Sequence, residues 1–277
     1  MNTQLEECRW LWNRLLEERK TAYEERKESL TLYMQHSRLP SLKDERPSLT
    51  LVHSQVLQNV GVRIDLAFKA FFRRMKADEK PGYPRFRGIG RYDSMTFPQA
   101  PSGCQVKEGR LVVSKTGSIK IKIHRPPEGN PKTCTLRRTS TRKWYATFSC
   151  DIGTPSPFPP SEERVGIDVG LTTFAHLSTG ETIKNPRFFR TEERELAKAQ
   201  RKLAKAEKGT PERTRQCKPV SRIHERIGWR RKNFAHQEAR KIVDRFGVIA
   251  IEDLSVNRMI HNRCFSKGIG DAAWAWS

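Results

Sequence analysis

Residues 165–171 read Val-Gly-Ile-Asp-Val-Gly-Leu, and residues 248–254 read Val-Ile-Ala-Ile-Glu-Asp-Leu. Each apolar, β-branched stretch predicts a buried strand. Each also carries a carboxylate, Asp168 in the first and Glu252 in the second. A charged carboxylate inside an apolar strand is unfavourable unless a partner compensates it. A divalent metal ion is such a partner, because hard cations prefer oxygen ligands. We therefore expect Asp168 and Glu252 to converge on one metal site.

The elements between the two strands favour a shared site. Residues 172–183 predict a hairpin, and two long basic helical stretches follow at about 190–207 and 211–245. An RNase H-like sheet has this order of elements, and two carboxylates can share a pair of Mg²⁺ or Mn²⁺ ions that cleaves phosphodiesters. Either carboxylate alone is more often a solvated residue at a strand end. The presence of both carboxylates in this order of elements favours a catalytic site. Asp253 follows Glu252 directly and should face the opposite side of the sheet, so it is not expected to be a ligand.

The charge of the chain predicts nucleic acid as its partner. The 277 residues include 53 Lys and Arg against 31 Asp and Glu, which gives a net charge of +22 and a pI near 10.1. A surplus of this size repels itself unless a polyanion neutralises it. Residues 80–150 carry 15 basic and 3 acidic side chains, and residues 191–241 carry 16 and 7. A charge run is usually a solvated face, but blocks with so few acids favour phosphate contacts.

Changes in composition predict four segments. Two apolar stripes at helical spacing predict a helical recognition hairpin over residues 1–79. Short β-rich runs between Gly turns predict a small, basic, wedge-like β-barrel over residues 80–151. A proline-rich linker follows at residues 152–163. Residues 164–277 then predict the metal-binding α/β domain, which contains the long helical insertion.

Aromatic and basic side chains are interleaved in the predicted barrel. This mixture can stack on bases and pair with phosphates. Strand alternation makes some of the aromatic residues core residues, and the sequence leaves open which ones. The candidate nucleic-acid contacts are Tyr83, Arg85, Arg87, Arg91, Arg142, Lys143 and Trp144, together with Arg230 and Arg231 in the helical insertion.

Several motifs together resemble one protein family. They are Gly-Ile-Asp-Val-Gly-Leu at 166–171, Ser-Arg-Ile-His-Glu-Arg at 221–226, Arg-Lys-Asn-Phe-Ala-His at 231–236 and Ile-Ala-Ile-Glu-Asp-Leu at 249–254. These motifs look like those of the TnpB (OrfB) proteins of insertion sequences, and Gly-Tyr-Pro-Arg-Phe-Arg at 82–87 resembles the first half of the same family. Its members are transposon-associated, RNA-guided DNA endonucleases with a RuvC-type domain, related to the type V CRISPR effectors.

The resemblance implies a fold, a reaction and partners. The fold would be α+β, with a helical hairpin, a small β-barrel and an incomplete RNase H-like (RuvC) domain. Asp168 and Glu252 would be the first and second catalytic acids and would bind Mg²⁺ or Mn²⁺. Guide RNA would lie against the barrel and helices, base pairing would read the target DNA, and the protein would read a short flanking motif. The resemblance also implies a prokaryotic, cytoplasmic, nucleoid-associated protein. No run of eighteen apolar residues predicts a membrane span.

The sequence also departs from the family pattern. Family members usually have a strand ahead of the first helix, and a Cys-x-x-Cys zinc ribbon and a third catalytic Asp after the Glu strand. We find none of these in the sequence, which indicates a fragment or a decayed copy. Asp271 precedes the position of the ribbon, so we expect it to be a residue at a helix N-terminus and not the third catalytic acid. His261-x-x-Cys264 has the spacing of half a zinc motif, and structural zinc needs four ligands.

Two alternatives to a nuclease remain open from the sequence. The first is a nuclease-inactive, RNA-guided DNA-binding remnant or repressor, which the missing third acid favours. The second is a structural RNA-binding protein of ribosomal type, which the two strand carboxylates disfavour.

Overall fold

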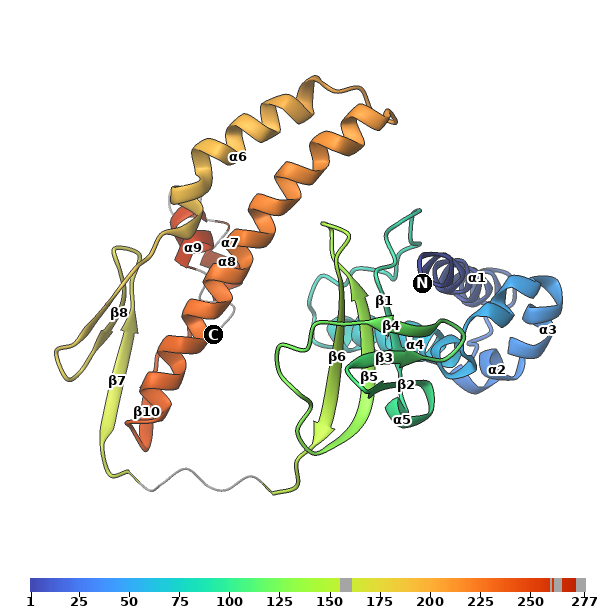
Figure 1. Cartoon of the computed structure of the whole chain (residues 1–277), viewed down its shortest axis with the longest axis horizontal. Helices are drawn as coiled ribbons and strands as arrows, with labels where there is room; N and C mark the ends of the chain where they lie inside the picture. Colours follow the sequence, from blue (N-terminus) through green and yellow to red (C-terminus); the bar gives the residue numbers. More distant parts are fainter. Residues whose placement is uncertain (155–160, 260, 262–265, 273–277) are drawn as a thin grey trace. The chain divides into compact units, whose positions relative to one another are not determined.

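The computed structural model describes residues 1–154, 161–259, 261 and 266–272. The chain divides into two compact units, Met1–Thr154 and Pro155–Ser277 (Figure 1). The described residues combine helices with small sheets, so the mixed α and β class predicted from the sequence is confirmed. No helix in these ranges is long and apolar enough to cross a membrane.

The first unit begins with two long helices and a helical connection between them. The long helices are α1 (Asn2–Arg26) and α4 (Ser54–Lys76), and the connection contains α2 (Leu32–Ser37), α3 (Leu39–Glu45) and the 3-10 helix η1 (Pro47–Leu51). Apolar residues three and four positions apart form one face of each long helix. These faces meet in the core, where the buried side chains include Leu5, Leu11 and Leu15 of α1 and Leu57, Val60 and Ile64 of α4.

The strands of the first unit form two open, three-stranded, antiparallel sheets. One has the order β1-β5-β6 and consists of β1 (Ser94–Phe97), β5 (Asn130–Arg138) and β6 (Trp144–Asp151). The other has the order β2-β3-β4 and consists of β2 (Cys104–Lys107), β3 (Arg110–Val113) and β4 (Gly117–Lys120). The short helix α5 (Ala100–Gly103) precedes β2.

The closed barrel predicted for this region is not formed by the described strands. A barrel has no edge strands, whereas the two described sheets leave four edges, β1 and β6 in one and β2 and β4 in the other. Of these edges, β4 has four residues and β6 has eight, and this difference in length limits the pairing between them. A groove of about 430 Å³ remains, lined by apolar side chains such as Ile119, Trp144 and Phe148.

The second unit contains a four-stranded sheet of order β10-β7-β8-β9 and a helical hairpin. Its strands are β7 (Arg164–Val169), β8 (Thr173–Leu177), β9 (Thr182–Lys184) and β10 (Val248–Ile251). The last strand pairs in parallel with β7, and the other pairs are antiparallel. The helices are α6 (Phe188–Lys205), α7 (Pro211–Val243), α8 (Val256–Met259) and α9 (Ser266–Ala272), of which α6 and α7 pack together as the hairpin (Figure 1).

The second unit has a thinner core than the first. Val165, Ala175, Leu177 and Phe246 form one small buried cluster, and Leu196, Ile223 and Ile227 form another between α6 and α7. The described residues leave β10 with little such cover, because Val248 is 52% exposed and Ile251 is 74% exposed. Its place in the sheet therefore depends mainly on the backbone ladder with β7.

Candidate metal centre and nucleic-acid interface

Asp168 and Glu252 lie at the carboxyl ends of two neighbouring parallel strands. The register pairs Ile251 of β10 with Ile167 of β7, and each carboxylate comes one position later. Continuing this register by one residue brings Glu252 beside Asp168, on the same face of the sheet. Neighbouring strands are about 4.8 Å apart, so both side chains can reach one ion.

The face that carries the two carboxylates is open to solvent. Val165 of β7 is buried, whereas Asp168 and Glu252 are both exposed. This differs from the sequence interpretation, in which both carboxylates were buried within apolar strands. Side chains alternate between the two faces of a strand, so the apolar residues of β7 cover the core while Asp168 points away from it. A shared metal site is therefore indicated by the adjacency of the two carboxylates and not by their burial.

His176 is a candidate functional residue that the sequence reasoning missed. It lies directly opposite Asp168 in the antiparallel pair of β7 and β8, and it is exposed. Such opposed residues have Cβ atoms about 4.5–5.5 Å apart. Its two neighbours in β8, Ala175 and Leu177, are buried, and this alternation is the signal that could have identified it. The open face thus carries Glu252, Asp168 and His176 in a row.

The donors at this edge fit an ion that prefers oxygen ligands. Carboxylates suit Mg²⁺ and Mn²⁺, and Asp168 and Glu252 supply two. Within the described ranges, no group of three or more His, Cys, Asp or Glu side chains is arranged to hold a metal. Of the half zinc motif, His261 is exposed, while Cys264 lies outside the described residues. The described donors can therefore hold one ion but are fewer than a two-ion site requires.

Asp271 stabilises the helical part of the unit instead of contributing to this edge. Its side chain is 2% exposed and pairs with Arg231 at 3.0 Å. It also accepts hydrogen bonds from the backbone N–H of Phe189 at 2.7 Å and of Arg190 at 3.4 Å. The first N–H groups of a helix have no partner inside the helix, so Asp271 caps α6 from α9. We predicted that it begins a helix of its own, but it lies near the end of α9.

The two arginines predicted in the helical insertion are both ion-paired. Arg231 is only 20% exposed and binds Asp271, so its charge is used within the fold. This differs from the phosphate contact that we expected. Arg230 pairs with Glu192 at 3.0 Å, but its side chain is 48% exposed. Of the two, Arg230 is therefore the one that keeps an accessible surface for a ligand.

The loop between α4 and β1 presents three of the predicted cations. The indole N–H of Trp12 donates to the carbonyl of Arg85 at 3.1 Å, and the Asn13 amide binds both the carbonyl of Arg87, at 2.9 Å, and its N–H, at 2.7 Å. These bonds hold the loop backbone on α1, while the side chains of Arg85, Arg87 and Arg91 are exposed. The guanidinium of Arg87 also lies over the Trp12 ring, 5.1 Å from its centroid. Exposed cations on a fixed backbone form a preorganised surface that could bind phosphates.

The predicted aromatic contacts are partly used by the core. Tyr83 makes edge contacts with Phe68 and Phe71, each with ring centroids 5.5 Å apart. Burial raises the pKa of Tyr83, although 44% of the residue is exposed. Trp144 begins β6 and packs against the core of the first unit. Stacking on a base is therefore open to the exposed part of Tyr83 more than to Trp144.

Arg142 and Lys143 lie in the turn between β5 and β6, and both are exposed. Arg142 has a φ of 66°, in the left-handed region that few non-glycine residues adopt. This backbone conformation produces a tight turn, which projects the two cations from the end of the hairpin.

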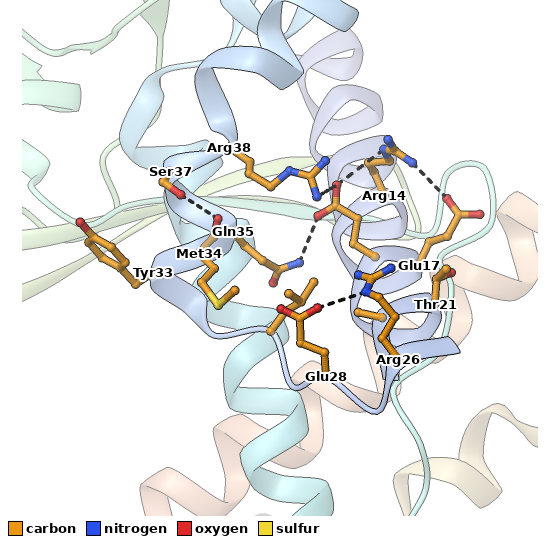
Figure 2. A pocket seen from close by; sticks show the side chains of 13 residues that line it. Arg14, Glu17, Thr21, Arg26, Glu28, Tyr33, Met34, Gln35, Ser37 and Arg38 are labelled. Carbon is orange, nitrogen blue, oxygen red and sulfur yellow. Dashed lines mark hydrogen bonds and ion pairs between the residues drawn. The ribbon is translucent and has the colours of Figure 1, made fainter. Parts of the chain in front are cut away.

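A hollow on the first unit carries balanced charge (Figure 2). It measures about 740 Å³ and lies between α1 and the segment that contains α2. Arg14 and Arg38 pair with Glu18 at 3.8 and 3.4 Å, and Arg26 pairs with Glu28 at 3.2 Å. Because its cations and carboxylates neutralise one another, this hollow lacks the positive surface that a phosphate backbone requires.

Comparison with known proteins identifies relatives over most of the chain. The OrfB family model of IS605 elements, described as "Probable transposase", matches residues 147–263, and a model described as "Helix-turn-helix domain" of the same family matches residues 1–28. A protein of Streptomyces pristinaespiralis named "Putative RNA-guided DNA endonuclease" is 32% identical over 271 residues, which is 96% of this chain and 66% of that protein. "Putative RNA-guided DNA endonuclease InsQ" of Escherichia coli strain K12 is 28% identical over 258 residues, or 91% of this chain.

This chain spans less than two thirds of the length of these relatives, 66% of the first and 61% of the second. A solved structure described as "Cryo-EM structure of the Cas12f1-sgRNA-target DNA complex" matches 99% of this chain and 76% of that chain. Its sequence identity is 14% and its TM-score is 0.30, so this likeness supports no structural argument.

Proposed function

Because the chain belongs to the OrfB family of insertion-sequence transposases, we propose that it is part of a transposon-associated, RNA-guided DNA endonuclease. The observation that carries the proposal is the adjacency of Asp168 and Glu252 at the carboxyl ends of two parallel strands. In this proposal the two residues are the catalytic acids of a RuvC-type, RNase H-like domain. The parallel pair of β10 and β7, continued by the antiparallel β8 and β9, supports that assignment.

The residues of the open face have distinct roles in the proposed reaction. Asp168 and Glu252 would hold Mg²⁺ or Mn²⁺, which when bound supplies the positive charge that activates water and stabilises the leaving oxygen. Both carboxylates are exposed, so a phosphodiester can approach them without any rearrangement of the sheet. His176 lies opposite Asp168 and can donate a hydrogen bond to its carboxylate, which would orient that ligand.

The proposed partners are a guide RNA and a target DNA. Base pairing between them would read the sequence, and the protein would read a short motif beside the target. The exposed cations of the loop over α1, Arg85, Arg87 and Arg91, support contact with a nucleic-acid backbone. The two exposed turn residues Arg142 and Lys143 add positive charge to the same first unit.

A second candidate function is a nuclease-inactive, RNA-guided DNA-binding protein. The observation that favours it is that the described residues contain no group of three or more His, Cys, Asp or Glu side chains arranged to hold a metal ion. Two-ion cleavage needs enough ligands for two ions about 4 Å apart. On this reading the chain binds RNA and target DNA but cuts DNA poorly.

A cleavage assay separates the two functions. The chain is tested with guide RNA, target plasmid and Mg²⁺, both alone and after fusion to the C-terminal segment of a longer family member. We expect weak cutting by the chain alone and efficient, guide-dependent cutting by the fusion. Asp168→Ala and Glu252→Ala should abolish cutting by the fusion, whereas Asp253→Asn, the matched neighbouring carboxylate, should leave it within about threefold. Efficient cutting by the Asp168→Ala fusion would refute the assignment of the site.

A further inference from the structure

One side of α6 carries a row of exposed cations. The row, called here the α6 row, consists of Arg190, Arg194, Lys198, Arg201, Lys202 and Lys205. Residues three and four positions apart lie on the same side of a helix. With a rise of 1.5 Å per residue, the row from Arg190 to Lys205 is about 22 Å long. It is therefore long enough to contact several consecutive phosphates.

The acidic residues of α6 do not neutralise this row. Glu192 is buried and pairs with Arg226 and Arg230 of α7, and Glu195 pairs with Arg226. Glu193 pairs with Lys267 of α9. These carboxylates are thus bound to the neighbouring helices. No member of the α6 row makes an ion pair within the described residues, so its positive charge is available to a ligand.

The row begins at a small positively charged hollow. This cavity of about 180 Å³ is lined by Leu171, Asn185, Arg187, Arg190, Lys267, Gly268 and Asp271. The carboxylate of Asp271 is already compensated by Arg231 and by the backbone N–H groups that it caps. Arg187 and Arg190 make no ion pair in the described part of the chain, so cationic groups dominate the hollow.

The hollow lies close to the candidate catalytic edge. Leu171 lines it and follows Asp168 by three residues. A chain spans at most about 3.6 Å per residue, so the Cα atoms of these two residues are within about 11 Å of each other. The row therefore begins at a hollow whose wall includes a residue within about 11 Å of Asp168.

We propose that the α6 row binds the backbone of the single-stranded DNA whose phosphodiester reaches Asp168 and Glu252. This inference rests on the proposed function and specifies how that site receives its substrate. The row occupies one side of one helix, so it can follow one backbone. Single strands are held in this way by cations that track successive phosphates without reading sequence. DNA is favoured over RNA because the row leads to the edge where DNA would be cut.

Binding of the full 277-residue chain to a labelled single-stranded oligodeoxynucleotide tests the proposal. The variant Arg194→Gln/Lys198→Gln/Arg201→Gln removes three cations of the row. The control Arg215→Gln/Arg240→Gln/Lys241→Gln removes three cations of α7 that pair with Glu212, Asp244 and Glu238. Both variants change the net charge equally. Affinity is measured over a range of salt, and an oligoribonucleotide of the same sequence serves as the second ligand.

We expect the row variant to bind the DNA at least about tenfold more weakly at low salt. Its log–log salt slope should fall by about 2, because each lost phosphate contact on a single strand contributes about 0.7. The control should change the affinity less than about threefold. Equal weakening by both variants, or an equal loss for the RNA, would overturn the α6 row as a DNA site while leaving the proposed function intact. Wild-type chain that binds neither ligand with salt-dependent affinity would overturn the proposed function as well.

Discussion

The two units differ in what covers their secondary structure. In the first unit, α1 and α4 bury their apolar faces so completely that Leu11, Leu57 and Ile64 are 0% exposed. In the second unit, Ile249 and Ile251 of β10 are 37% and 74% exposed. The free energy of folding should therefore come from apolar burial in the first unit. In the second unit, a larger share should come from the ionic contacts that join α6, α7 and α9.

In the second unit, the candidate catalytic residues differ from the residues that stabilise the fold. The candidate catalytic residues Asp168, His176 and Glu252 are exposed on one face of the weakly covered sheet. Because they contribute little to packing, they can be changed with small effects on folding. Asp271 and Arg231, in contrast, are mostly buried and paired with each other, so they contribute to the stability of the second unit.

The largest expected effect tests the ionic junction of the second unit. Asp271→Ala leaves Arg231 as an unpaired, mostly buried charge and removes the cap of α6, so we expect a loss of about 3–5 kcal/mol. Asp244→Ala is the control, because it removes a carboxylate of an exposed i,i+4 pair with Arg240 and should cost less than about 1 kcal/mol. Denaturant unfolding, followed by hydrogen exchange of the α6 amides, measures both. Equal losses would show that the junction does not dominate the stability of this unit.

The next effect compares the two cores directly. Leu57→Ala removes a fully buried side chain of the first unit and should destabilise it by about 2–5 kcal/mol. Ile251→Ala truncates a 74% exposed residue and should change stability by less than about 0.5 kcal/mol. Urea unfolding of both variants gives the two values. A loss above about 2 kcal/mol for Ile251→Ala would mean that β10 is covered in solution.

A smaller effect concerns pH and the first unit. The hydrogen bond of Arg46 to Glu7, with the Arg46 Nε 2.6 Å from the carboxylate, lowers the pKa of Glu7 below 4.5. A lowered folded-state pKa contributes stability that is present above the unfolded pKa and is lost as the pH falls through the folded value. Glu7→Gln should therefore destabilise the chain at pH 7, and its difference from wild type should shrink below about pH 4.5. If the stability difference between Glu7→Gln and wild type stays constant across this pH range, the hydrogen bond between Glu7 and Arg46 is not the cause of the destabilisation.

Long periodic segments could be predicted from the sequence, whereas long-range partners could not. The basic stretches predicted at 190–207 and 211–245 correspond to α6 and α7, because amphipathic periodicity over many residues identifies a helix. The strands around Asp168 and Glu252 were also predicted, since short apolar runs indicate them. Their parallel pairing gives the adjacency that the candidate site needs.

Other features depend on contacts that no local pattern contains. Closure of a barrel requires the edge strands of the two sheets to pair with each other, and the periodicity of a single strand does not predict such pairing. The partner of Arg231 is Asp271, 40 residues later, so Arg231 looked like a free cation. His176 faces Asp168 only because the hairpin of β7 and β8 has its particular register, and a slip of one residue would move it to the other face.

Titration of the full chain with Mn²⁺, followed by calorimetry, tests most directly whether Asp168 and Glu252 form one metal site. The comparison uses wild type, Asp168→Asn, Glu252→Gln and the matched control Asp253→Asn. We predict that wild type binds the ion and that each of the first two variants weakens binding at least about tenfold, because each removes one of the two charged ligands. Asp253→Asn should stay within about twofold of wild type. Equal weakening by Asp253→Asn, or binding that does not respond to Asp168→Asn, would contradict a shared site.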